Sequence, residues 1–250
     1  MTFGKLLFWR LTVPGVVRLV PPGLRVAHGP FAGMHYVAPR AFGSSLSAKL
    51  LGSYECELHP VVRDIQTMPF RRLIDVGAAE GYYAVGFAMT MPGLAEVVAF
   101  EDGPEGRSLL SRMAARNGQE RIDVRGRCEL ADLSTVVADG RDTLVVCDTE
   151  GYEDVLLNPS AVEGLGRCHV LVETHDFLRP GVTDELCRRF SPSHHVTRIL
   201  SRPRLPSDFP GRNWAARLAP SRLLLRAVGE GRPGPMTWLW MTPLAVASAG

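Results

Sequence analysis

The run Leu73-Ile74-Asp75-Val76-Gly77-Ala78-Ala79-Glu80-Gly81-Tyr82 contains the features that decide the fold. Its first residues form a short apolar run, which is typical of a buried strand, and Tyr82 begins a longer amphipathic stretch that predicts a helix. Gly77 permits a tight turn between them, while Ala79 and Gly81 keep the backbone bare. We therefore expect a strand, a turn and a helix whose N-terminus faces a ligand.

The same alternation continues along the chain. We expect further strands at 97–100, 144–147 and 169–172, weaker ones at 122–130, 195–200 and 236–241, and helices at 82–91, 104–117 and 183–190. Nearly continuous apolar strands between helices predict an α/β fold with a doubly wound, mostly parallel sheet covered on both faces. The last strand follows a Gly/Pro-rich turn at 229–235, so we expect an antiparallel edge strand.

Length and composition indicate an ordinary globular protein. Of the 250 residues 46% are apolar and 22% charged, which excludes a disordered chain or a coiled coil. No apolar run reaches the roughly 18 residues of a membrane-spanning helix. We divide the chain into an N-terminal arm with a helix over 46–68, together residues 1–69, and a main domain at 70–250.

The expected location is cytoplasmic. The five cysteines form no C-x-x-C pair and are odd in number, which indicates a reducing compartment rather than a disulfide framework. The apolar segment at 5–20 is interrupted by Arg10 and Pro14, and no small-residue cleavage site follows it, so we do not interpret it as a signal peptide. A helix lying on a membrane surface is the alternative for that segment.

The charges are unevenly distributed. Residues 1–72 carry nine basic and three acidic residues, 73–190 carry eleven and twenty-one, and 191–250 carry eight and two. Basic flanks can face an anionic partner, and arginines mixed with Phe209 and Trp214 would suit single-stranded RNA. The alternatives are a compositional bias or a solvated surface.

Carboxylates surround the predicted turn. Asp75 and Glu80 would serve dinucleotide phosphates poorly, whereas a cationic cofactor without phosphates, such as S-adenosylmethionine, suits them. The next strand ends at Glu101-Asp102, about 20 residues past the turn, where an acid can bind ribose hydroxyls. Asp132, after the third strand, could accept a hydrogen bond from an adenine amino group or cap a helix. The expected cofactor-binding residues are Asp75, Gly77, Ala79, Glu80, Gly81, Glu101, Asp102 and Asp132.

Four blocks in order resemble the FkbM type of class I S-adenosylmethionine-dependent methyltransferase. They are Asp75–Tyr83, Phe100–Glu105 with Asn117-Gly118, Cys147-Asp148-Thr149-Glu150-Gly151-Tyr152-Glu153, and Val170–His175. The resemblance implies a Rossmann-like sheet of seven strands, S-adenosylmethionine as methyl donor, donor binding at Asp75, Gly77, Gly81 and Glu101, and often a hydroxyl acceptor on a sugar or another metabolite. Ala79-Glu80 and Cys147 depart from the usual motif residues.

The catalytic candidates end the fourth and fifth expected strands. We predict His175 as general base, since histidine titrates in the useful range, with Glu173 or Asp148 as its partner. The alternative is that this edge holds Mg²⁺, with ligands from Asp148, Glu150, Glu173 and His175. We do not favour that alternative and assign no metal ligand.

The sequence therefore predicts a methyltransferase that methylates oxygen on a small metabolite or sugar. The alternatives are a methyltransferase acting on RNA or a peptide, a nucleoside-binding protein without activity, and a nicotinamide-dependent oxidoreductase. RNA rests on charge alone, because Asp148-Thr149-Glu150-Gly151 is not the Asn/Asp-Pro-Pro-aromatic loop used on base amines. The oligomeric state is not predicted.

Overall fold

The computed structural model describes residues 23–42, 44–211, 218–232 and 234–244. The apolar segment at 5–20, for which a membrane-surface helix is the alternative and which we do not interpret as a signal peptide, lies outside these residues. Within them, no helix has both the length and the apolar character needed to cross a membrane.

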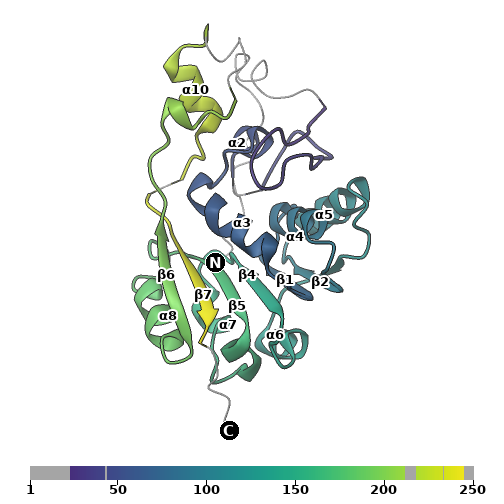
Figure 1. The fold of residues 1–250 in the computed structure, drawn as a ribbon, viewed down its shortest axis with the longest axis vertical. Helices are drawn as coiled ribbons and strands as arrows, with labels where there is room; N and C mark the ends of the chain where they lie inside the picture. The colour runs from purple at the N-terminus through teal and green to yellow at the C-terminus, as the bar shows by residue number, and fades with distance from the viewer. Residues whose placement is uncertain (1–22, 43, 212–217, 233, 245–250) are drawn as a thin grey trace.

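A seven-stranded sheet forms the centre of the molecule (Figure 1), in the order β3-β2-β1-β4-β5-β7-β6. The strands are β1 (Arg72–Val76), β2 (Glu96–Phe100), β3 (Asp123–Arg125), β4 (Thr143–Cys147), β5 (His169–Thr174), β6 (His194–Leu200) and β7 (Thr237–Pro243). The pairs among β1 to β5 are parallel. The predicted doubly wound α/β sheet is confirmed.

The last strand is antiparallel, as its Gly/Pro-rich turn predicted. It pairs with both β5 and β6, so β6 forms the outer edge and β7 lies one position inside it. Trp238 and Leu239 of β7 are fully buried, whereas most of β6 is exposed or half-buried. The more apolar of these two strands, β7, therefore occupies the inner position in the sheet.

Helices cover both faces of the sheet. Alternate strand residues enter two different cores: Leu73 packs with α3 (His59–Thr67), α4 (Tyr82–Thr90) and α5 (Pro104–Arg116). Ile74 packs on the opposite face with α6 (Leu130–Val137), α7 (Glu153–Leu156) and α8 (Val182–Phe190). The near-continuous apolar runs of the sequence reflect this burial on two sides.

The expected helix over 46–68 is wrong as a single element. The structure has α2 (Leu46–Leu51), a 3₁₀ turn η1 (Cys56–Leu58) and then α3. Gly52 ends α2 at φ +77°, and a Cβ there would lie 1.9 Å from the carbonyl oxygen of His28. The apolar spacing continues through the break, so periodicity alone did not reveal it.

A cap lies over the carboxyl ends of the parallel strands. We use this name for the described parts of 23–58 and 201–232, which include α2, η1, η3 (Pro206–Asp208) and α10 (Ser221–Val228). Figure 1 shows α2 and α10 close together at the end of the molecule toward which the parallel strands run. Within the described residues, the part of the arm before α2 is largely irregular, as expected, but Phe31, Tyr36 and Leu50 pack into the same core as the sheet.

Gly77 offers a direct test of the turn after β1. Its φ is +83°, and a Cβ would lie 1.7 Å from the backbone oxygen of Asp148. We expect Gly77→Ala to lower the free energy of unfolding by at least about 3 kcal/mol, because the clash adds to a left-handed penalty of about 1–2 kcal/mol. Gly118→Ala is the control: φ is +66° but nothing lies within 4 Å of the added carbon. Equal losses of unfolding free energy in Gly77→Ala and Gly118→Ala, measured by urea denaturation, would contradict the expected clash at Gly77.

Candidate active site

The turn after β1 lies where the strand order reverses. The chain runs outward from β1 through β2 to β3 and then crosses back to β4 on the other side of β1. Ligands in open α/β sheets bind at such a switch point, outside the carboxyl ends of the strands. The N–H groups of Gly77 and Ala78 both donate to the carbonyl of Phe100 at 2.9 Å, which fixes the turn against β2.

Asp75 lies beneath this turn, 2% exposed. Its carboxylate accepts a hydrogen bond from the backbone of Ala84 in the first turn of α4, while Oδ2 has no partner. Burial, aided by Glu101 and opposed by the Ala84 hydrogen bond, raises the pKa of Asp75 to about 7. A ligand that donates a hydrogen bond would satisfy the remaining oxygen.

Glu101 closes the other side of the turn. Its Oε2 accepts from the N–H of Ala79 at 2.9 Å, and its Oε1 accepts from the N–H of Gly103 at 2.7 Å. A carboxylate has about four lone-pair sites, so both oxygens can still accept ribose hydroxyls. Asp102, the neighbouring candidate, has a side chain that is 75% exposed and only a 3.9 Å contact with Arg127.

Glu80 does not belong to this group. Its side chain is 1% exposed and points into the cap, where Oε1 lies 2.6 Å from Nζ of Lys49 and Oε2 accepts from the N–H of Phe42 at 3.0 Å. Tyr36 also donates to Oε1. Glu80 therefore anchors the N-terminal arm through both carboxylate oxygens, and its expected contact with a cofactor stays a prediction.

Asp132 occupies the helix-capping role that the sequence left open. It is exposed at the third position of α6 and accepts from the N–H of Glu129 at 3.0 Å, within a capping box. This hydrogen bond accounts for an acid at that position without an adenine contact.

His175 and Glu153 form the centre of the catalytic candidates. His175 follows β5 and is 1% exposed, and its Nδ1 lies 2.7 Å from Oε1 of the fully buried Glu153. Burial lowers the pKa of His175, but the Glu153 hydrogen bond and charge outweigh it, so the pKa is raised overall. Burial raises the pKa of Glu153, but His175 and the N–H of Gly151 hold it below its usual value.

The partner of His175 therefore differs from the expectation. Asp148 and Glu173 approach the other ring nitrogen instead: Nε2 lies 3.5 Å from Asp148 Oδ1, 3.5 Å from Glu150 Oε2 and 3.8 Å from Glu173 Oε2. Burial and neighbouring Glu150 and Glu55 raise the pKa of Asp148. Burial, with Asp148 and Glu55, also raises the pKa of Glu173. The predicted residues Asp148, Glu173 and His175 do lie together, but both carboxylates approach Nε2 of His175, and Glu153 contacts Nδ1.

This group is the one in the described residues that offers metal-ligand geometry. One atom each from Asp148, Glu173 and His175 lie within 4.8 Å of one another. The buried Oδ1 of Asp148 has no hydrogen-bond partner, and Glu153 holds the opposite ring nitrogen, as carboxylates do behind metal-bound histidines. These two carboxylates and one imidazole suit a divalent cation, so the structure is compatible with the Mg²⁺ alternative.

Sequence reasoning gave no role to three residues of this region. Glu153 stands in a quoted motif, and its spacing from Glu150 was the signal for it. Glu55 and Arg232 are 177 positions apart and have no local signal, yet their side chains meet beside Glu173. Only the folded chain brings them together.

The C-terminal arginines largely neutralise acids of this chain. Arg198 pairs with Asp184 at 2.7 Å, Arg202 with Asp208 at 2.6 Å, and Arg204 with Glu57 and Glu230 at 2.5 and 2.6 Å. Arg222 and Arg226 line a surface hollow on α10, while Arg212, Trp214 and Arg217 lie outside the described residues. The internal pairs weaken the charge argument for RNA.

Comparison with solved structures places the fold. Ribosomal protein L11 methylase from Lactobacillus delbrueckii subsp. bulgaricus superimposes with a TM-score of 0.51 at 17% identity, over 84% of either chain. The O-methyltransferase TomG from Streptomyces achromogenes, solved with SAM, gives 0.46 at 16% identity, over 74% of this chain and 78% of that one. The O-methyltransferase from Bacillus cereus, in complex with SAH, gives 0.44 at 14% identity, over 75% and 80%.

The first of these comparisons, together with the strand order, shows a Rossmann-like methyltransferase fold. No protein-family model matches it, and no curated protein matches its sequence. The particular family, including the FkbM-type resemblance, therefore stays a prediction.

Asp75 gives a pH-dependent prediction. Its pKa rises from 3.8 to about 7 on folding, so the folded state binds more protons than the unfolded state between these values. The free energy of unfolding therefore falls as the pH rises through this window, and Asp75→Asn should remove that part of the fall, roughly 2–4 kcal/mol. Urea denaturation at pH 4, 6 and 8, with Asp132→Asn as control, measures it. A difference between wild type and Asp75→Asn that is independent of pH would contradict the raised pKa.

A substitution at Glu80 distinguishes a structural role in the cap from a role in binding the cofactor. Glu80→Gln leaves the ammonium of Lys49, 4% exposed, without its carboxylate. We expect a loss of about 3–5 kcal/mol in the free energy of unfolding, as when one partner of a buried pair is removed. The double variant Lys49→Met/Glu80→Gln should recover part of it. Unchanged stability with weakened nucleoside binding, measured by calorimetry, would restore the cofactor role.

Proposed function

We propose that this protein is an S-adenosylmethionine-dependent methyltransferase that methylates a hydroxyl oxygen of a small metabolite or sugar. The observation that carries the proposal is the buried His175–Glu153 pair, whose free ring nitrogen faces Asp148 and Glu173 next to the turn after β1. The methyltransferase fold supports it. The neighbours solved with SAM or SAH motivate the choice of donor.

The donor would lie across the carboxyl ends of β1 and β2. The turn Gly77–Gly81 offers bare backbone, Glu101 the acceptors for ribose hydroxyls, and Asp75 an unsatisfied oxygen. Asp102 and Asp132 are outlying candidates at the same edge. Acids without a nearby phosphate-binding lysine or arginine in this turn suit a sulfonium and an ammonium group better than a pyrophosphate.

In the proposed reaction the acceptor oxygen attacks the methyl carbon in line with the sulfonium. The new O–C bond forms as the C–S bond breaks, the sulfur keeps that electron pair, and S-adenosylhomocysteine leaves as a neutral thioether. His175 takes the hydroxyl proton on Nε2. Glu153 fixes the ring through Nδ1, and the carboxylates of Asp148 and Glu173 stabilise the imidazolium that forms.

Donor binding can be tested by a thermal melt. At 100 times Kd a ligand adds about 2.7 kcal/mol, which is roughly 5–11 °C for a domain of this size. We expect S-adenosylmethionine and S-adenosylhomocysteine to produce this shift and NADH to produce none. Glu101→Ala should reduce the shift through the loss of ribose hydrogen bonds, whereas Glu120→Ala, on the exposed turn after α5, should not. A shift with NADH alone would favour an oxidoreductase.

Proton transfer can be tested by the pH dependence of turnover. Because the pKa of His175 is raised, kcat should increase with pH through values above about 6.5, the ordinary pKa of histidine. His175→Gln should remove this limb and lower kcat by about 10²-fold or more, while donor affinity stays within twofold. His195→Gln, at an exposed position of β6, is the matched control. The readout is S-adenosylhomocysteine release with a panel of hydroxyl-bearing acceptors.

The same assay separates the alternatives. A rate that is lost with EDTA and restored by Mg²⁺ would assign Asp148, Glu173 and His175 to a cation, which would lower the pKa of a bound hydroxyl and leave no proton-accepting role for Nε2. Turnover with RNA or peptide but with no hydroxyl metabolite would overturn the acceptor class. Tight donor binding without turnover on any acceptor would indicate a nucleoside-binding protein.

A further inference from the structure

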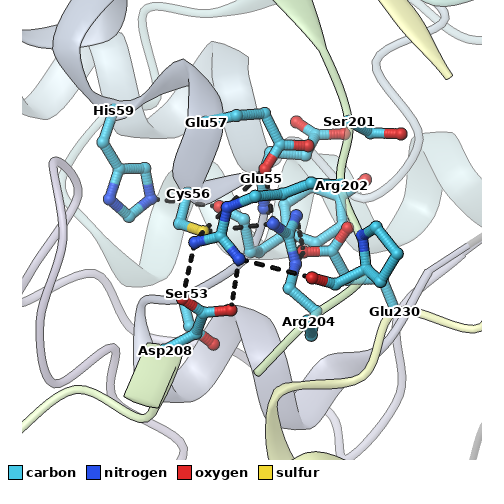
Figure 2. A network of polar contacts seen from close by, with 12 residues as sticks. Ser53, Glu55, Cys56, Glu57, His59, Ser201, Arg202, Arg204, Asp208 and Glu230 are labelled. Atoms are coloured by element: carbon cyan, nitrogen blue, oxygen red, sulfur yellow. Dashed lines mark hydrogen bonds and ion pairs between the residues drawn. The ribbon is translucent and has the colours of Figure 1, made fainter. Parts of the chain in front are cut away.

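A buried polar network joins the two halves of the cap. Figure 2 shows residues of 53–59 facing residues of 201–208 and Glu230. Arg204 is 6% exposed and lies at its centre, 2.5 Å from Glu57 and 2.6 Å from Glu230, with the sulfur of Cys56 at 3.1 Å. Glu230 also accepts from the N–H of Glu55 at 2.8 Å. The network thus fastens the C-terminal half of the cap to the turn after α2.

Arg232 extends this network down to the candidate catalytic group. Its three guanidinium nitrogens contact three acids: Nη2 lies 2.5 Å from Glu55, Nε lies 2.8 Å from Glu230, and Nη1 donates to Oε1 of Glu173. The arginine side chain is 16% exposed and the three carboxylates are 1–6% exposed. One residue therefore contacts both halves of the cap and the end of β5.

A second path runs from Arg232 to the donor side. Glu55, which Arg232 holds through Oε1, accepts a hydrogen bond from the hydroxyl of Tyr83 through Oε2. Tyr83 lies in the first turn of α4, two residues after Gly81 of the turn that follows β1. Glu55 and Arg232 therefore lie between the two parts of the site, the turn after β1 and the end of β5.

Arg232 is the neighbouring group that most favours the carboxylate form of Glu173. Its Oε1 is engaged by Arg232, and its Oε2 faces Nε2 of His175 at 3.8 Å. Burial, Asp148 and Glu55 favour the protonated acid, whereas Arg232 and then His175 favour the carboxylate. The planar guanidinium also sets the direction of the carboxylate, because it holds one oxygen and leaves the other toward His175.

We propose that Arg232 is a positioning residue that holds the Glu173 carboxylate beside His175 and ties that carboxylate to the cap. The role assigned to Glu173 rests on the proposed function, but the position and charge that Arg232 imposes on it do not. The guanidinium contributes no atom to the reaction. It acts through Glu173 on His175 and through Glu55 on α4.

The test is an NMR titration of the histidine Cε1–H signals, one from each of the seven histidines of the full chain, with neither donor nor acceptor present. His175→Gln identifies the signal of His175 by its disappearance. The titration is then compared among wild type, Arg232→Gln, Arg232→Lys and Arg204→Gln. Arg204→Gln is the matched control, because it removes a buried arginine from Glu230 without touching Glu173.

Several charged groups face His175 and Glu173 and together determine the titration midpoint of His175. They are Glu55, Asp148, Glu150, Glu153 and Arg232. We expect Arg232→Gln to move the titration midpoint of His175 by about one pH unit, since an opposite charge within 4–6 Å shifts a pKa by about 1–3 units. The midpoint rises if Glu173 stays ionised and falls if Glu173 captures a proton. Either shift supports the proposal.

Arg232→Lys keeps the positive charge but not the planar fork that contacts three acids, so we expect it to displace the midpoint less than Arg232→Gln does. Because it retains the charge among the buried acids, this variant also guards against misfolding of Arg232→Gln. Arg204→Gln should lower the melting temperature and leave the midpoint unchanged. Equal midpoints in Arg232→Gln and wild type, with the fold intact, would overturn the proposal. So would equal displacement in Arg204→Gln.

Turnover provides a separate readout. If methyl transfer is detected, Arg232→Gln should lower kcat at least about 10-fold near neutral pH, and Arg204→Gln should change it less than twofold, since a displacement of one pH unit changes the fraction of competent enzyme by up to tenfold. Absent turnover in wild type would count against the proposed function and leave the titration interpretable. A shifted titration with unchanged kcat would show that Glu173 does not act in the reaction.

Discussion

The parallel register of β1, β4 and β5 places the ends of three strands level with one another. Val76 pairs with Cys147, and Cys147 pairs with Val172. The next residues of β4 and β5, Asp148 and Glu173, therefore emerge side by side, and Gly77 can cross only because it has no Cβ to meet the backbone of Asp148. A slip of one residue in either strand would turn these acids toward the opposite face and separate the group around His175.

The same edge of the sheet concentrates negative charge away from water. Removing carboxylates from water is costly unless they are paired or hydrogen-bonded. The structure meets this requirement in different ways: Glu80 is paired with Lys49, Glu153 accepts from His175 and two backbone N–H groups, and Glu173 is paired with Arg232. Asp75 and Asp148 are less well satisfied, because each keeps one buried oxygen without a partner. At a ligand-binding edge, a bound cation or hydrogen-bond donor gains the most binding free energy where it pairs with an unsatisfied buried oxygen.

The sequence predicts the sheet more completely than it predicts the candidate site. The strands of the inner sheet are short apolar runs, so their positions and parallel order follow from local pattern. Gly77, Glu101, Asp148 and His175 became candidates because they lie at or just after the ends of those runs. Glu80 belongs to the same motif but turns toward Lys49, because a residue in a turn can point either way and only packing decides. The partner of His175 was expected to be Glu173 or Asp148, and Glu153 is the acid that contacts Nδ1. This difference is likewise a matter of side-chain direction, which spacing along the chain does not encode.

The basic flanks acquire a different meaning once the chain is folded. Arg202, Arg204 and Arg232 all come from the C-terminal excess of arginine, and all three pair with acids of this chain, two of them with acids that are buried. The acidic middle and the basic flanks are therefore partly complementary to one another rather than to an outside partner. Arginine suits this position better than lysine because one planar guanidinium can contact Glu55, Glu173 and Glu230 at once, which a point charge on a flexible stem does not do with the same geometry. The C-terminal segment thereby contacts the candidate site through Arg232 and Glu173. His175 beside it is 1% exposed, and a low dielectric there strengthens every charge interaction that methyl transfer would use.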